Sequence, residues 1–125
     1  MGTATKMILV GENGTFEGVS IIPGVMIGLN ALSDGTAQLP QVSLEKPGRV
    51  IAKNTVDCMK SGVIYGNASM IDGMIQRSFE EYGSSIPVYA TGGLASTIVK
   101  YCRSEIILDE QLVLSGLNII YKKNV

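Results

Sequence analysis

The sequence predicts one α/β domain over residues 1–125, with helices packed over a mixed sheet. The first observation behind this prediction is the order of segments: a hairpin and two helices, then a strand, a helix, a strand and a helix. The second is composition, because 46% of the 125 residues are hydrophobic and can bury a core. The chain also shows no internal repeat and no low-complexity segment.

The chain begins with a predicted β-hairpin. Ala4–Val10 predicts the first strand, and Thr15–Ile22 predicts the second. Between them, Glu12-Asn13-Gly14 is a turn signal, because Asn-Gly tolerates the positive φ of tight hairpin turns.

A first helix and an extended connection follow the hairpin. Pro23-Gly24 ends the second strand, and Val25–Leu32 carries apolar residues at helical spacing. The segment Asp34–Arg49 is polar and rich in Gly and Pro, so we expect an extended connection, with a short strand over Gln41–Leu44.

A long helix is predicted to begin after Asn54, a good N-cap, with Asp57 in the first turn, where a negative charge favours the helix dipole. Gly83 ends it at a plausible C′ position. Roughly 28 residues at ~1.5 Å each give a helix of about 40 Å. Its apolar residues keep a helical period: Val56, Met59, Val63, Met70, Met74 and Ile75.

The middle of this helix is rich in small residues: Ser61, Gly62, Gly66, Ala68, Ser69 and Gly73. Glycine inside a helix costs about 1 kcal/mol relative to alanine, so several glycines imply a compensating close contact. Two explanations stay open at this point, packing within the chain and a subunit interface.

The last third of the chain predicts alternating short elements. We expect a strand over Ile86–Ala90, a helix over Leu94–Tyr101, a strand over Ile106–Leu108, and a final helix over 110–121 capped by Asp109.

Composition excludes several classes of function. Ten basic and eleven acidic residues give a net charge of −1, which offers no footprint for nucleic acid. The absence of histidine removes the commonest general base and metal ligand. Cys58 and Cys102 lie far apart in no metal or redox spacing, and we expect buried free thiols. The apolar stretch Val19–Ser33 is interrupted and falls short of a membrane helix, so we expect a cytoplasmic protein with no membrane partner.

Three segments combine residues that suit a phosphate or a polar ligand. Gly2-Thr3-Ala4-Thr5 offers backbone N–H groups and hydroxyls at the head of a strand, where an ordinary strand start is the alternative. Thr91-Gly92-Gly93 lies between a strand and a helix, where a tight turn is the alternative. Lys53-Asn54-Thr55 heads the long helix, where a plain cap is the alternative.

Taken in order, these segments resemble the C-terminal half of type III pantothenate kinase, in the actin-like, sugar-kinase and chaperone ATPase superfamily. The resemblance covers essentially the whole chain. The segments that carry it are Gly2-Thr3-Ala4-Thr5, Gly18 to Gly24, Thr36-Ala37-Gln38-Leu39-Pro40, Lys53-Asn54-Thr55, Met59-Lys60-Ser61-Gly62, Asp72-Gly73, Thr91-Gly92-Gly93-Leu94-Ala95 and Leu114-Ser115-Gly116-Leu117.

The resemblance implies an RNase-H-like domain, the second of two that close around ATP, with the N-terminal half absent from this chain. Family enzymes transfer the γ-phosphate of ATP to pantothenate on the path to coenzyme A, with Mg²⁺ and a monovalent cation, K⁺ or NH₄⁺. By this analogy Gly2, Thr3 and Ala4 belong to the second phosphate loop. The analogy likewise places Thr91, Gly92 and Gly93 on the adenosine side of the nucleotide.

For the second substrate, Thr55 matches a threonine that touches pantothenate across a homodimer interface. The resemblance implies that this interface is built largely on the helix over about 54–82. Of the two explanations for the small residues of that helix, the resemblance therefore favours a subunit interface.

The resemblance also shows what this chain lacks. The family loop reads Asp-x-Gly-Thr-Ala-Thr, and its cation-binding aspartate would precede Met1. The first phosphate loop and the Gly-x-Asp-Arg segment with the catalytic aspartate are missing too. We therefore expect no catalytic residue and no metal ligand here, and Asp72 is better explained as a buried hydrogen-bonding partner than as a catalytic acid.

Two functions remain in competition. The chain is either half of a pantothenate kinase, inactive alone and completed by a separate N-terminal-half polypeptide, or a non-catalytic module for nucleotide binding, dimerisation or regulation. A remnant without any ligand is the third possibility.

Overall fold

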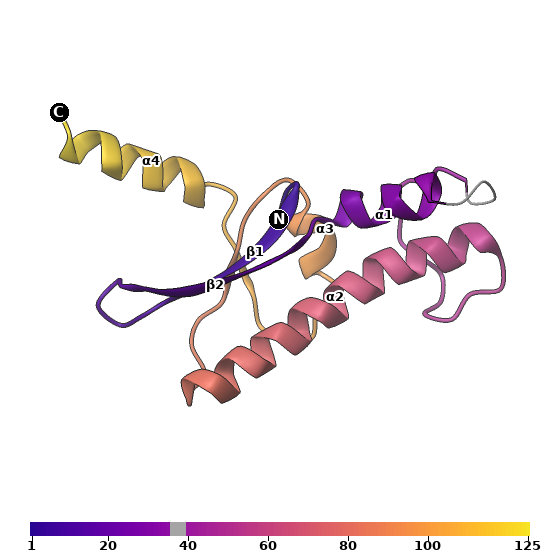
Figure 1. Ribbon diagram of the computed structural model, residues 1–125, viewed down its shortest axis with the longest axis horizontal. Coiled ribbons are helices and arrows are strands. Elements are labelled where there is room, and N and C mark those ends of the chain that lie inside the picture. The colour runs from indigo at the N-terminus through magenta and orange to yellow at the C-terminus, as the bar shows by residue number, and fades with distance from the viewer. Residues whose placement is uncertain (36–39) are drawn as a thin grey trace. The chain divides into compact units, whose positions relative to one another are not determined.

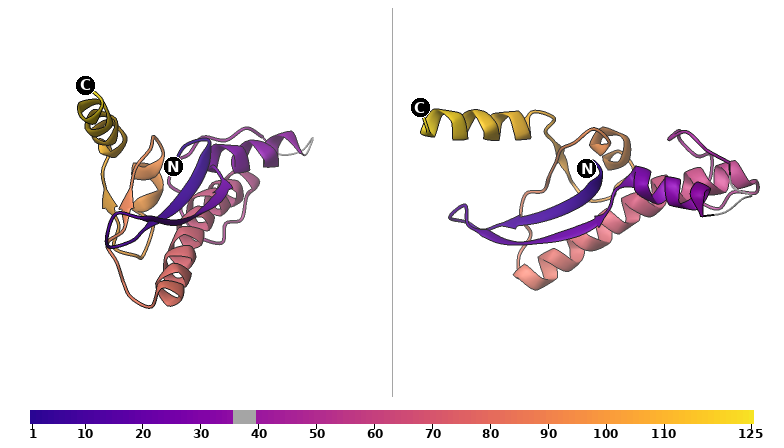
Figure 2. Two further views of the ribbon diagram at one scale, coloured as in Figure 1. Left: turned by 60° about the vertical axis from the view of Figure 1, so that its left-hand side comes forward. Right: turned by 45° about the horizontal axis from the view of Figure 1, so that its top comes forward.

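The computed structural model describes residues 1–35 and 40–125, so Thr36-Ala37-Gln38-Leu39 lie outside the described residues. The chain divides into two compact units, Met1–Ile64 and Tyr65–Val125, and each is described by itself. The elements can be followed along the chain in Figures 1 and 2. Both helices and strands are present, so the mixed α/β class is confirmed.

The first unit opens with the predicted hairpin, the two long arrows of Figure 1. Strands β1 (Ala4–Val10) and β2 (Phe16–Pro23) pair antiparallel, from Ala4 opposite Pro23 to Leu9 opposite Gly18. Gly14 adopts φ 73° in the turn and donates its N–H to the Gly11 carbonyl at 2.9 Å. The turn signal in the sequence therefore predicts the observed hairpin.

The two faces of the hairpin differ in exposure. Thr5 on β1 is 2% exposed, and its Oγ1 is buried without a hydrogen-bond partner in the described chain. The face opposite Thr5 carries large apolar side chains that are exposed: Ile8, Val10, Phe16, Val19 and Ile21. An exposed apolar face of this kind commonly marks an interaction surface.

Helix α1 (Val25–Asp34) starts directly after β2 and buries Val25 and Leu29. Gly24 precedes it and donates its N–H to the Thr3 carbonyl at 3.0 Å. A Cβ added to Gly24 would collide with the backbone of Gly2 and Thr3. The start of α1 can therefore approach the start of β1 only because residue 24 lacks a side chain.

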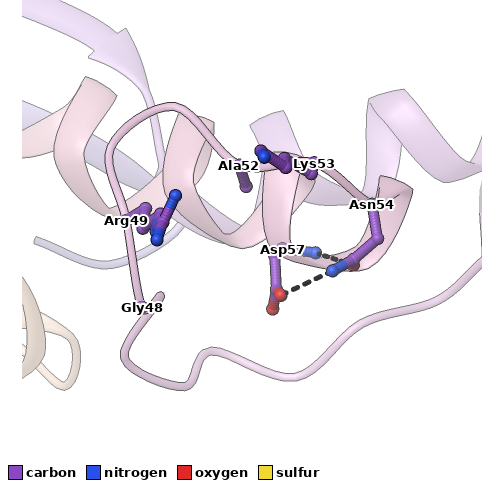
Figure 3. A pocket seen from close by; sticks show the side chains of 6 residues that line it. All are labelled: Gly48, Arg49, Ala52, Lys53, Asn54 and Asp57. Atoms are coloured by element: carbon purple, nitrogen blue, oxygen red, sulfur yellow. Dashed lines mark hydrogen bonds between the residues drawn. The ribbon is translucent and has the colours of Figure 1, made fainter.

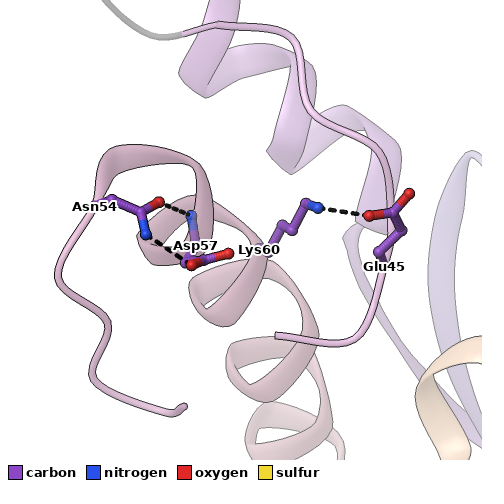
Figure 4. Close-up of polar contacts among 4 residues, drawn as sticks. All are labelled: Glu45, Asn54, Asp57 and Lys60. Atoms are coloured by element: carbon purple, nitrogen blue, oxygen red, sulfur yellow. Dashed lines mark hydrogen bonds and ion pairs between the residues drawn. The ribbon is translucent and has the colours of Figure 1, made fainter. Parts of the chain in front are cut away.

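The connection between α1 and the next helix contains no strand over Gln41–Leu44, so that prediction was wrong. A strand needs a neighbour for its backbone groups, and no described segment pairs with these residues. Side chains of the following helix hold the connection instead. Lys60 Nζ lies 2.7 Å from Glu45 Oε2 (Figure 4). Ser61 Oγ donates to the Val50 carbonyl.

Helix α2 (Thr55–Tyr82) has the 28 residues that the sequence predicts. Asn54 caps it, because its Oδ1 accepts the Asp57 N–H at 3.0 Å and its Nδ2 donates to Asp57 Oδ2 at 2.7 Å. Gly83 adopts φ 83° and donates its N–H to the Phe79 carbonyl at 2.8 Å, which ends the helix as expected.

One face of α2 is buried and another is lined by small residues. The buried apolar residues are Met59, Val63, Ile64, Ala68, Ile71 and Ile75. Gly62, Gly66 and Gly73 are exposed, and beyond the adjacent residues and the backbone of α2 itself no described atom lies within 4 Å of a Cβ added to them. Packing within the described chain therefore does not account for these three glycines.

The second unit contains β3 (Tyr89–Ala90), α3 (Ala95–Val99), β4 (Ile107–Leu108) and α4 (Leu112–Lys123). Strands β3 and β4 pair in parallel, with α3 between them in sequence. The described strands therefore form two separate pairs, and the expectation of one mixed sheet was wrong. β3, α3 and β4 fall within their predicted ranges but are shorter. The two strands are short because their ladder joins only two residue pairs.

The last helix begins later than predicted. Gln111, not Asp109, is the N-cap residue of α4, although the Asp109 carboxylate accepts the Gln111 N–H at 2.9 Å. Asp109 therefore forms a turn ahead of the helix. No residue of α4 is buried in the described chain.

The two cysteines differ in exposure. Cys58 is exposed, so its predicted burial was wrong; it lies on the outer surface of α2. Cys102 is half-buried, with Sγ 3.8 Å from the carbonyl oxygens of Ala68 and Ile98. Burial and the nearby Asp72 charge raise the pKa of the Cys102 thiol to about 11, which keeps it protonated at neutral pH.

A Gly24→Ala substitution tests the close approach of α1 to β1. The added methyl group should displace the Gly2–Thr3 backbone and lower the free energy of unfolding by about 1–3 kcal/mol. Gly28→Ala is the matched control on α1, because a Cβ there meets no atom within 4 Å. Gly28→Ala should raise the free energy of unfolding by up to ~1 kcal/mol, because alanine favours the helix over glycine. Urea denaturation of both variants measures the difference, and a Gly24→Ala protein as stable as the parent would contradict the close approach.

Candidate functional site

The turn at residues 2–4 is held at the head of β1. Gly2 donates its N–H to the Ala4 carbonyl at 3.2 Å, and the Thr3 carbonyl accepts the Gly24 N–H at 3.0 Å. Gly2 and Thr3 are exposed, whereas Ala4 is half-buried as the first residue of β1. The Thr3 side chain therefore lies at the surface, on a backbone that the hydrogen bond from Gly24 holds in place.

A second polar side chain lies directly after this turn. Thr5 is the next residue on β1 and carries the buried hydroxyl without a partner. An unpaired buried hydroxyl costs about 1–3 kcal/mol, so it marks a place where the described chain leaves a polar group unsatisfied.

The turn at residues 91–93 joins β3 to α3. Gly92 adopts φ 106°, in the left-handed region that glycine tolerates, and its carbonyl accepts the Ala95 N–H at 3.0 Å. Gly93 is exposed, and a Cβ added there meets no atom within 4 Å. Helix α3 has five residues, fewer than predicted, so the dipole at its N-terminus is weaker than that of a longer helix.

Thr55 is the first residue of α2 and is exposed. At 3.6 residues per turn, it lies on the same helix face as Gly62, Gly66 and Gly73, which follow it by 7, 11 and 18 positions. The threonine and the exposed glycines therefore belong to one surface of α2.

The candidate residues divide between the two units. Gly2, Thr3, Ala4 and Thr55 belong to the first unit. Thr91, Gly92 and Gly93 belong to the second. Each turn is built by local backbone contacts of its own unit.

Asp72 accepts backbone hydrogen bonds, and its predicted role as a hydrogen-bonding partner is confirmed. The N–H of Arg103 lies 2.8 Å from Oδ2, and the N–H of Ser104 lies 2.9 Å from Oδ1. Its side chain is half-buried rather than buried. Partial burial raises the pKa of Asp72. The hydrogen bonds from Arg103 and Ser104 and the positive charge of Arg103 lower the pKa by more, so it lies below the ordinary 3.8. The carboxylate thus ties α2 to the loop after α3.

The structure adds a cavity that the sequence did not indicate. It has a volume of about 390 Å³ and lies where the connection enters α2 (Figure 3). Its lining residues are Gly48, Arg49, Ala52, Lys53, Asn54 and Asp57. The sequence signal that could have indicated this cavity is the pair Arg49 and Lys53, four positions apart and just before the helix cap Asn54.

Metal ligation and membrane insertion find no support in the structure. Residues 1–35 and 40–125 contain no group of three or more Cys, Asp or Glu side chains that could hold a metal ion. Over the same residues, every helix falls short of the length or apolar character needed to cross a bilayer.

Replacing Asp72 by Asn tests the carboxylate at residue 72. The folded-state pKa is lowered, so its stabilisation is complete above about pH 4 and is lost as pH falls through the lowered value. After a discount for partial exposure, Asp72→Asn should lower the free energy of unfolding by roughly 1–2 kcal/mol at pH 7.

The difference between parent and variant should shrink as pH falls from 7 to 3 in chemical denaturation. Glu81→Gln, an exposed acid on the same helix, is the control and should change little at either pH. A difference for Asp72→Asn that stays constant with pH would contradict the assignment.

Known proteins resemble this chain over its whole length. The sequence model of the type III pantothenate kinase family matches residues 1–77. The type III pantothenate kinase of Acholeplasma laidlawii is 44% identical over 125 residues, which are 100% of this chain and 50% of that protein. That of Syntrophus aciditrophicus is 43% identical over 98% of this chain and 48% of its own length.

A solved structure shares the fold. A Campylobacter jejuni protein, described as belonging to a Baf family of transcriptional activators, matches with a TM-score of 0.66 and 25% identity over 98% of this chain and 55% of its own. The chain spans about half the length of the curated relatives it matches. On the match to more than half of its residues, the chain belongs to the type III pantothenate kinase family.

Proposed function

We propose that this chain is the C-terminal, RNase-H-like half of a type III pantothenate kinase, forming one domain over residues 1–125. The complete enzyme transfers the γ-phosphate of ATP to pantothenate and forms 4′-phosphopantothenate for coenzyme A synthesis. The observation that carries the proposal is the 44% identity to such a kinase over all 125 residues.

Two turns are assigned to the nucleotide. Gly2, Thr3 and Ala4 would line the phosphate oxygens, with the Thr3 hydroxyl as the side-chain donor, and the close contact with Gly24 supports this by fixing the turn. Thr91, Gly92 and Gly93 would let the adenosine side approach the backbone closely, which the positive φ of Gly92 and the open space at Gly93 support.

Thr55 is assigned to pantothenate, donated to the partner subunit of a homodimer. The supporting observation is that Thr55 shares one face of α2 with Gly62, Gly66 and Gly73, whose surroundings are open. A second copy packed on these glycines would come close to Thr55, because small residues let two helix backbones approach.

The catalytic aspartate and the aspartate for K⁺ or NH₄⁺ are assigned to the N-terminal half of the enzyme, which these 125 residues do not include. Phosphoryl transfer needs positioned phosphates, Mg²⁺ and a carboxylate that orients the attacking hydroxyl. Asp72 is occupied by the backbone of Arg103 and Ser104, so it does not replace that carboxylate. The exposed apolar residues of the hairpin offer that half of the enzyme a surface to cover.

Reconstitution tests the proposed function. The chain is mixed with the segment of the Acholeplasma laidlawii kinase that its match leaves out, and ATP-dependent formation of phosphopantothenate is measured. Each piece alone should be inactive, because the phosphate clamp and the base are divided between them, and the mixture should be active. If the folded and associated pieces bind ATP but show no activity, the chain is better explained as a non-catalytic binding module. Turnover by the pure chain alone would refute the proposal that the catalytic groups are divided between the two pieces.

The dimer face has its own test. Gly66→Leu should raise the dimer dissociation constant at least ~10-fold, because its side chain would separate two closely packed helices, a loss of about 1.4 kcal/mol. Glu81→Leu is the control, an exposed residue of α2 away from the glycine face. Sedimentation velocity over a concentration series measures both variants, and an unaltered dimer for Gly66→Leu would refute the assignment.

A further inference from the structure

The cavity at the start of α2 is formed by one short stretch of chain. Its lining residues lie between Gly48 and Asp57, all within the first unit. Its volume of about 390 Å³ falls within the range of small-molecule sites, about 300–1,000 Å³. The cavity therefore has room for a small metabolite and not only for an ion with its water.

The charges around the cavity are unbalanced. Arg49 and Lys53 bring two positive charges, whereas Asp57 brings one negative charge. The Asp57 carboxylate already accepts a hydrogen bond from Asn54 Nδ2 at 2.7 Å. Within the described residues, neither Arg49 nor Lys53 forms an ion pair with an acidic side chain. The cavity thus keeps a net positive charge that favours an anion.

Contacts with α2 and with the protein interior hold the chain around Arg49 and Lys53. Ser61, which is 4% exposed, donates its hydroxyl to the Val50 carbonyl. Pro47 is fully buried just before the cavity, and Lys60 pairs with Glu45 at 2.7 Å. Because the loop is already ordered, an anion would bind without the entropy cost of fixing it.

The cavity is distinct from the surface that carries Thr55. Residues 55 and 57 lie about 200° apart around a helix of 3.6 residues per turn, so their side chains leave α2 on opposite sides. Asp57 lines the cavity and Thr55 does not. The inference below therefore does not rest on the proposed function and concerns a second site.

We propose that this cavity binds the oxyanion group of a small metabolite, a carboxylate or a phosphate, through Arg49 and Lys53. The guanidinium of Arg49 presents parallel N–H groups that match two oxygens of either group. The ammonium of Lys53 adds a point charge from the other end of the anchored loop. Carboxylate and phosphate share this chemistry, and the experiment separates them.

The test is an NMR titration of the full, ¹⁵N-labelled chain at constant ionic strength. The probes are inorganic phosphate, pantothenate as the carboxylate, and panthenol, its uncharged alcohol analogue. Phosphate, pantothenate or both should shift the backbone amides of residues 48–57 in a saturable way, and panthenol should not. A phosphate-only or pantothenate-only response assigns the source of the oxyanion.

Two variants tie the response to the two cations. The double variant Arg49→Gln/Lys53→Gln should weaken the binding at least ~10-fold, whereas Arg49→Lys, which keeps the charge, should weaken it less. Lys6→Gln/Lys122→Gln removes the same charge from exposed positions elsewhere and should bind as the parent does. All four positions are exposed, so the variants should keep the folded spectrum.

Several results would overturn the inference. One is the absence of any saturable shift at residues 48–57 with both phosphate and pantothenate. Another is equal binding by the parent and the Arg49→Gln/Lys53→Gln variant. Equal binding of panthenol and pantothenate would show that the oxyanion plays no part. None of these outcomes bears on the kinase reconstitution, so the two proposals can fail separately.

Discussion

The first unit depends on one close contact, the approach of Gly24 to the backbone of Gly2 and Thr3. Gly24 bonds to the Thr3 carbonyl, and no side chain fits at this position. The contact sets where α1 begins and holds the N-terminal turn at the head of β1. A turn fixed in this way can present the Thr3 hydroxyl without further ordering, which is what a phosphate site requires.

Helix α2 connects the remaining features through its own contacts. Asn54 caps its start next to Thr55, and Lys60 and Ser61 hold the loop that bears Arg49. Its exposed glycines share a face with Thr55. One helix thus carries the residue proposed to bind pantothenate, the proposed dimer surface and the side chains that hold the loop of the cavity.

Local signals in the sequence predicted much of this structure. The Asn13-Gly14 turn, the Asn54 cap and the Gly83 end need only neighbouring residues, and all three were confirmed. Features that depend on distant partners were missed, such as the absent strand over 41–44 and the exposure of Cys58. The cavity escaped notice because it needs the loop to fold back on Ser61. The family followed from ordered motifs, whereas the roles of the site residues remain proposals.

The central proposal is that two turns, Gly2 to Ala4 and Thr91 to Gly93, each contact ATP. The most direct measurement is an NMR titration of the ¹⁵N-labelled chain, mixed with the unlabelled complementary segment, with Mg²⁺ and a non-hydrolysable ATP analogue. The account predicts saturable shifts of the amides of Gly2, Thr3 and Ala4 and of Thr91, Gly92 and Gly93. Saturable binding that leaves both turns unshifted would contradict it.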